Sequence, residues 1–137
     1  MQNEEDEEEK NIRLTNLRET RRLVSEKRGA SGDKPVEVTD ATFEEVTENH
    51  PLVVIDCWAP WCGPCQIVAP VIEELSGNYA NKILFGKLNV DENPEINAQY
   101  EIMSIPTLLV FKNRKLVDRI IGAMPRQMLE QRIIHHL

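Results

Sequence analysis

The sequence predicts an α/β protein whose central mixed β-sheet is flanked by helices on both faces. Short apolar segments rich in β-branched residues alternate with helical patterns between residues 35 and 137, and such alternation is typical of this fold class. The segment 52–57 is apolar almost throughout, as expected of a central strand covered on both faces. The last two strands, 107–111 and 116–121, are separated by a turn too short for a parallel crossover, so they must be antiparallel.

The first elements of this domain follow a boundary placed at Pro35. A short strand is expected at 36–38. Asp40 is a residue type that caps helix N-termini, and we expect it to cap the next helix. Phe43 and Val46 are three residues apart, which places both on the buried face of that helix.

The middle of the chain continues the alternation after the strand at 52–57. A helix is expected over 62–79, with Pro70 kinking it. A strand follows at 83–90. Asn93 then precedes a proline at the first helical position, which predicts a short helix over 94–100.

The C-terminal part is expected to form a hairpin and a closing helix. The hairpin turn falls at Asn113 and Arg114. The helix should cover 125–137, with Met128, Leu129 and Ile133 toward the core.

Residues 1–34 are expected to form a charged N-terminal extension. Residues 1–10 carry six acids and one lysine, which predicts disorder. Residues 11–28 carry six bases against two acids and lack proline and glycine, so they could form a helix. The small polar segment 29–33 is typical of a linker. Two interpretations stay open: a solvated tail, or a segment that docks on a partner or on the domain itself.

The composition of the chain argues against several classes of function. The chain has 137 residues, of which 41% are hydrophobic and 28% charged, a balance typical of one globular domain. Its net charge of −7 disfavours nonspecific nucleic-acid binding, which needs basic patches. The longest apolar run, 52–55, is far short of the roughly 20 residues of a membrane helix. The acidic N-terminus resembles no secretory signal, so we expect a cytoplasmic protein.

Two cysteines three residues apart suggest redox chemistry. Cys62 and Cys65 stand at the start of the expected helix, where residues three apart have Cβ atoms about 5–6 Å from each other. Modest adjustment would let a disulfide close. Cys62 lies where the unpaired N–H groups and the helix dipole favour a thiolate. Cys65 lies one turn deeper and should be more buried and more often protonated. One cysteine would attack and the other would resolve.

Zinc is the main alternative use of this pair. A structural zinc site takes four ligands, and the remaining candidates are Cys57 and three histidines. None of them forms a second paired spacing, so we expect no metal. Cys57 is expected to be an inert buried thiol.

Asp56 is a carboxylate at the end of an apolar strand. Burial should raise its pKa. A carboxylate poised near neutral pH could relay a proton to or from the resolving thiol through water. The alternative is an aspartate that only hydrogen-bonds the backbone.

From about Val36 to Leu137 the chain resembles the thioredoxins. The C-x-x-C spacing alone is weak, but Trp61-Cys62-Gly63-Pro64-Cys65 followed some forty residues later by Ile105-Pro106-Thr107 is specific. Further matching strings are Val54-Ile55-Asp56, Trp58-Ala59-Pro60, Ala69-Pro70, Lys87-Leu88-Asn89-Val90-Asp91 and Ile121-Gly122-Ala123. The resemblance implies the thioredoxin fold and a dithiol–disulfide oxidoreductase that reduces protein disulfides.

The resemblance also implies residue roles. Cys62 would be the attacking thiolate and Cys65 the resolving thiol, with Asp56 and Lys87 close together beneath them. Apart from the resemblance, Trp58 could be core packing alone, and we expect it also to form a wall of the active site. Pro106 matches the family's cis-proline. The substrate-contacting surface would consist of Trp61, Gly63, Pro64, Ile105, Pro106 and Gly122.

Three features depart from the family pattern. Arg114 replaces a turn glycine, so either Asn113 adopts a positive φ or the loop is longer than two residues. Gln66 stands where a lysine often follows the second cysteine. Residues 1–34 have no counterpart in a minimal thioredoxin.

The partners follow from the same resemblance. We expect disulfide-containing substrate proteins and a thioredoxin reductase or equivalent donor. We expect no organic cofactor and no binding to nucleic acid or to a membrane. We expect the protein to be a monomer. The alternative function is a thioredoxin-fold binding module in which the extension recruits a partner and redox activity is secondary.

Overall fold

The computed structural model describes residues 34–137, so the interpretations of residues 1–33 lie outside the described part. The helices and strands alternate in the predicted order. They are β1 (Val36–Glu37), α3 (Phe43–Glu48), β2 (Leu52–Trp58), α4 (Gly63–Asn78), β3 (Leu84–Asn89), α5 (Pro94–Gln99), β4 (Thr107–Lys112), β5 (Lys115–Ile121) and α6 (Arg126–Ile134). No helix within 34–137 is long and apolar enough to cross a membrane.

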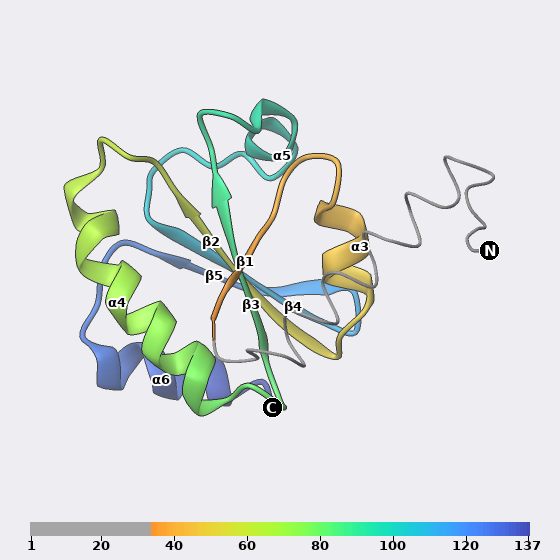
Figure 1. Cartoon of the computed structure of the whole chain (residues 1–137), viewed down its shortest axis with the longest axis vertical. Coiled ribbons are helices and arrows are strands. Elements are labelled where there is room, and N and C mark those ends of the chain that lie inside the picture. The colour runs from red at the N-terminus through yellow and green to blue at the C-terminus, as the bar shows by residue number, and fades with distance from the viewer. Residues whose placement is uncertain (1–33) are drawn as a thin grey trace.

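The strands form one mixed sheet in the order β1-β3-β2-β4-β5. Strands β1 and β2 run parallel to β3, whereas β4 runs antiparallel to both β2 and β5. Helices α4 and α6 lie on one side of the sheet, and α3 and α5 lie on the other (Figure 1). The predicted mixed sheet with helices on both faces is therefore confirmed.

Two apolar cores lie on the two faces of the sheet. Ile55 and Cys57 of β2 join the core beneath α3 and α5, whereas Val54 joins the core beneath α4 and α6. Because side chains alternate along a strand, Asp56 lies on the same face as Val54. The sheet thus places the only acidic residue of β2 beneath α4.

The prediction that Asp40 caps the next helix is wrong. The N-cap residue of α3 is Thr42. The Asp40 carboxylate instead accepts hydrogen bonds from the backbone N–H groups of Glu95 and Ile96, at 3.1 and 2.9 Å, in the first turn of α5. Asn93 occupies the expected cap position of α5, but its side-chain oxygen accepts from the Asp40 N–H at 2.8 Å. The carboxylate therefore caps a helix more than fifty residues away.

The prediction for α6 is correct at two of its three positions. Leu129 and Ile133 are buried, but Met128 is 56% exposed. Positions 129 and 133 are four residues apart and share one face of the helix. Met128 precedes Leu129 by one residue, about 100° around the helix, and faces away from the core.

The hairpin between β4 and β5 has a loop of two residues. Both Asn113 and Arg114 adopt positive φ angles, 51° and 73°. This is the pattern of a type I′ turn, whose twist matches that of the flanking strands. Of the two alternatives, the structure therefore shows the positive φ and excludes the longer loop. Arg114 occupies a backbone conformation that normally favours glycine.

Candidate active site

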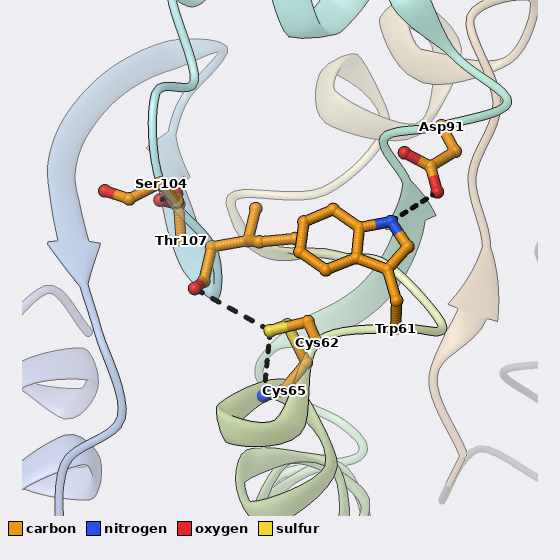
Figure 2. The surroundings of a disulfide bond; sticks show 7 residues. Trp61, Cys62, Cys65, Asp91, Ser104 and Thr107 are labelled. Carbon is orange, nitrogen blue, oxygen red and sulfur yellow. Dashed lines mark hydrogen bonds between the residues drawn. A yellow bond between two sulfur atoms is a disulfide. The ribbon is translucent and has the colours of Figure 1, made fainter.

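The cysteine pair lies where β2 delivers the chain to the N-terminus of α4. Cys62 is the N-cap residue with an extended backbone, and Cys65 lies in the first turn. The two residues form a disulfide with their Cα atoms 5.3 Å apart (Figure 2). The Cys62 N–H donates to the Ala59 carbonyl at 3.1 Å, which fixes the approach to the helix.

The surroundings of Cys62 favour a sulfur anion. The backbone N–H of Cys65 donates to Cys62 Sγ at 3.2 Å. The other unpaired N–H groups of the first turn add the positive end of the helix dipole. The Ile105 carbonyl oxygen lies 3.7 Å from the same sulfur, so a thiol at Cys62 has an acceptor when it is protonated.

The expected difference in burial between the two cysteines is not found. Cys62 is 4% exposed and Cys65 is 3% exposed. Trp58, Val90 and Ile105 pack against the cluster that Ala59 and the two cysteines form. In the disulfide form, therefore, both sulfurs are held below the surface.

Asp56 is 1% exposed and is paired in register with Lys87 of β3. Burial raises the pKa of Asp56 to about 6, and the positive charge of Lys87 partly opposes this rise. Neither carboxylate oxygen has a hydrogen-bond partner within residues 34–137. The alternative that Asp56 only hydrogen-bonds the backbone is therefore wrong.

Lys87 also contacts the wall of the site. Its Nζ lies 4.9 Å from the centroid of the Trp58 ring, a distance typical of a cation–π contact. Trp58 in turn packs against the cluster of Ala59, Cys62 and Cys65. The ring therefore connects Lys87 to the cysteine pair.

Trp61 lies at the surface beside the disulfide and is 71% exposed. Its Nε1 donates to Asp91 Oδ2 at 2.8 Å, and the indole lies between Asp91 and the cysteine pair (Figure 2). Asp91 has no role predicted from the sequence. A signal was present, because Trp61 and Asp91 follow the ends of neighbouring parallel strands, and such ends meet at one edge of a sheet.

The remaining residues expected at the substrate surface also have defined positions. Gly63 and Pro64 are exposed in the first turn of α4. The Ile105–Pro106 peptide bond is cis, and Pro106 is buried although it was expected at the surface, whereas Ile105 is half-buried. The Gly122 N–H donates to the Pro106 carbonyl at 2.8 Å, and Gly122 has a φ of 89°. This hydrogen bond connects the segment after β5 to the loop that lies against Cys62.

Cys57 is buried and forms no disulfide. Burial raises its pKa to about 12, with the negative charge of Asp56 adding to the rise. A thiol of this pKa forms almost no thiolate near neutral pH. Within the described residues, no group of three or more histidine, cysteine, aspartate or glutamate side chains is arranged to hold a metal ion.

Comparison with known proteins gives the family. The thioredoxin family model matches residues 34–135. The chain belongs to the thioredoxin family. It is 49% identical over 102 residues to thioredoxin 1 of a Nostoc species, covering 74% of this chain and 95% of the relative. It is 46% identical over 105 residues to thioredoxin 2 of Chlorobaculum tepidum, covering 76% of this chain and 96% of the relative.

A solved structure agrees with this assignment. A point mutant of a thioredoxin from Halobacterium salinarum superposes with a TM-score of 0.72 at 30% identity, covering 77% of this chain and 92% of that chain. The expected thioredoxin fold is thus confirmed. With its cysteine pair at disulfide distance, the chain is a thioredoxin-type protein-disulfide oxidoreductase.

Proposed function

We propose that this chain reduces disulfides in substrate proteins, with the Cys62–Cys65 dithiol as the two-electron donor. The Cys62 thiolate attacks one sulfur of the substrate disulfide and releases the other as a thiolate. This forms a mixed disulfide between Cys62 and the substrate. The Cys65 thiolate then attacks Cys62 Sγ, releases the second substrate thiolate and leaves the Cys62–Cys65 disulfide.

One observation carries the assignment of Cys62 as the nucleophile. Its sulfur is the side chain at the N-cap of α4 and accepts the Cys65 N–H at 3.2 Å. Such a donor stabilises the thiolate that attacks the substrate disulfide in the first step. Cys65 lies inside the helix, where its sulfur is suited to the intramolecular second attack.

Asp56 is proposed as the base for the second step. Its pKa of about 6 means that it is mostly ionised at neutral pH and can still accept a proton. We propose that it takes the Cys65 proton through water as that thiol attacks. Lys87 is a positioning residue that limits the rise of the Asp56 pKa.

The substrate is proposed to bind over the disulfide, along the residues around it. These are the exposed Trp61, Gly63 and Pro64, the half-buried Ile105 and Gly122, and the buried Pro106 beneath them. The hydrogen bond from Trp61 to Asp91 holds the indole in place, so part of this surface is ordered before the substrate arrives. Such ordering lowers the entropy cost of binding.

The working cycle needs a second partner. A thioredoxin reductase or equivalent donor must supply two electrons to the Cys62–Cys65 disulfide after each turnover. We place this cycle in the cytoplasm, where thiols are kept reduced. All the proposed site residues come from one chain, so a monomer suffices.

Dithiol-dependent reduction of insulin tests the proposal. We expect the chain to accelerate reduction of the insulin disulfides by dithiothreitol, measured as precipitation of the freed B chain. Cys62→Ser should abolish the acceleration because the nucleophile is lost. Cys57→Ser is the matched control and should retain activity, since Cys57 is buried away from the reaction.

The same assay separates the two candidate functions. A protein that only binds a partner has no need of the dithiol. Equal insulin reduction with the intact chain and with Cys62→Ser would reject the reductase and leave the binding module in which the extension recruits a partner.

A further inference from the structure

A hollow of about 420 Å³ opens beside β1, on the outer edge of the sheet. We call it the β1 hollow. Its lining residues come from β1 and its approach, from the ends of β2 and β3, and from the turn after β3; they are Pro35, Val36, Glu37, Trp58, Lys87, Asn89 and Glu92. The described chain begins at Lys34, directly beside this hollow.

The walls of the β1 hollow combine apolar surface with unpaired negative charge. Pro35, Val36 and the half-buried Trp58 give the apolar part. Glu37 and Glu92 are exposed, and within residues 34–137 neither forms a salt bridge. Lys87 is the one cation of the lining, and its Nζ lies over the Trp58 ring.

The segment 11–28 of the same chain has the complementary chemistry. It carries six bases against two acids, and it includes the apolar pair Leu23-Val24 just before Lys27 and Arg28. Glutamates at the rim of a partly apolar hollow suit basic side chains that follow an apolar pair.

The covalent connection makes this contact short-range. Seven residue steps separate Arg28 from Pro35, and an extended chain of that length spans up to about 24 Å. Since Pro35 is itself part of the wall, Arg28 can reach every part of the hollow. A short tether also gives a high effective concentration, so weak contacts suffice for docking.

We propose that the basic segment 11–28 docks in the β1 hollow of its own chain, with Lys27 and Arg28 near Glu37 and Glu92. The docked segment covers Trp58 and Lys87, which line the hollow, and Trp58 also forms a wall of the cysteine site. The extension is therefore an intramolecular cover for one side of the redox centre. The proposed docking does not depend on whether the cysteine pair reduces or oxidises its substrates.

Acrylamide quenching of Trp58 fluorescence in the full chain tests the proposal. The chain has two tryptophans, so Trp61→Phe leaves Trp58 as the only one. Acrylamide is neutral, which means that charge changes do not alter its access. Lys27→Glu with Arg28→Glu should make Trp58 easier to quench, because losing two exposed ion pairs lowers the docked-to-undocked ratio about threefold to tenfold.

A charge exchange makes the test specific. Glu37→Lys with Glu92→Lys should increase quenching by a similar amount, and combining both pairs of changes should restore protection. The matched control is Glu44→Lys with Glu48→Lys, two exposed residues of α3 that do not line this hollow; it should leave quenching unchanged. At about 1 M salt the difference in Trp58 quenching between the charge variants and the parent chain should shrink, since the screening length is then only about 3 Å.

Three results would overturn the proposal. Equal quenching in all variants would show that the segment does not cover Trp58. A change with the α3 control as large as that with Glu37 and Glu92 would show general attraction to an acidic domain instead of a site. Protection that rises with protein concentration would show that a second copy fills the hollow. None of these readouts depends on disulfide reduction, so they are separate from the test of the proposed function.

Discussion

The carboxylate of Asp56 is buried without a hydrogen-bond partner in the described structure. An unsatisfied buried polar group costs about 1–3 kcal/mol, and a charged one costs more. The nearby Lys87 only partly offsets this cost, because burial still raises the pKa of Asp56 to about 6. Perturbed groups of this kind gather at functional sites, and Asp56 lies on the face of β2 beneath α4.

The pH dependence of stability should reveal this cost. The pKa of folded Asp56 is about 6, against an ordinary value of 3.8, so the folded state binds the proton more tightly. Asp56 therefore lowers the free energy of unfolding as pH rises through the unfolded pKa, and the penalty levels off above about 6. Asp56→Asn should stabilise the oxidised protein at pH 7 by up to about 3 kcal/mol. The gain should disappear below about pH 4.

Denaturant melts at several pH values measure this effect. Asp118→Asn is the matched control with the opposite sign, because the hydrogen bond from Arg132 lowers the pKa of Asp118. The Asp118 contribution is present above the unfolded pKa and is lost as pH falls. If Asp56→Asn destabilises the chain at pH 7, the account of Asp56 as an uncompensated carboxylate is wrong.

The same substitution should separate the two chemical steps. Asp56→Asn keeps the shape of the side chain but removes the base, so resolution of the mixed disulfide by Cys65 should slow. Loss of a general base typically costs about 10²–10⁴-fold in its step. The first attack by Cys62 should persist. Stopped-flow measurement of both phases tests this, and resolution at the wild-type rate would leave Asp56 with no role as a base.

At the scale of elements, side chains that join distant segments hold the site region together. Asp40 follows β1, yet its carboxylate accepts two backbone N–H groups at the start of α5. Asn93 completes the connection by accepting the Asp40 N–H and donating to the Asn89 carbonyl. The end of β3 and the start of α5, which flank Asp91, are thereby fixed.

Removing this cap should lower stability. Asp40→Ala leaves two N–H groups of α5 without their acceptor, and loss of an N-cap typically costs about 0.5–2 kcal/mol. The control is Glu48→Ala, an exposed position at the end of α3, which should have little effect. Urea melts give both values. Equal stability of Asp40→Ala and the parent chain would mean that solvent replaces the cap without loss.

The backbone of Arg114, in the turn between β4 and β5, is strained, and glycine at this position should relieve the strain. Arg114 has a φ of 73°, a region that costs a side chain about 1–2 kcal/mol relative to the right-handed one. Arg114→Gly should raise the free energy of unfolding by about 0.5–1 kcal/mol after the added flexibility of the unfolded chain is counted. Arg114→Ala, which keeps a Cβ, should give no such gain. An equal gain from both variants would point to the arginine side chain instead of the backbone.

At the scale of the whole molecule, the sequence predicted local features well and distant contacts poorly. The strands, helices and the two-residue turn follow from periodicity, proline and asparagine over a few neighbouring residues. The partners of Asp40 and Trp61 could not be predicted in this way, because they lie on other elements and depend on how strands pair. The prediction that Met128 is buried failed for a related reason. The pattern of apolar side chains in α6 does not show which of them faces the sheet.

The site itself could be predicted in part because its chemistry is local. The spacing of Cys62 and Cys65 places both at one helix N-terminus, and the structure brings them together there. Their equal burial could not be predicted, because the covering residues Val90 and Ile105 come from distant loops. The parallel strands β2 and β3 end at the same edge of the sheet, which is why Trp61 and Asp91 meet beside the disulfide.

Trapping of the reaction intermediate tests the central claim, that Cys62 attacks and Cys65 resolves. Each single serine variant is reduced, mixed with a protein disulfide and analysed by mass spectrometry after peptide mapping. Cys65→Ser should accumulate a mixed disulfide at Cys62, since the attack proceeds and the resolving thiol is absent. Cys62→Ser should accumulate almost none, because the N-cap position and the N–H donation that stabilise a thiolate belong to Cys62. A mixed disulfide that forms at Cys65 in the Cys62→Ser variant as fast as at Cys62 would contradict the assignment of the nucleophile.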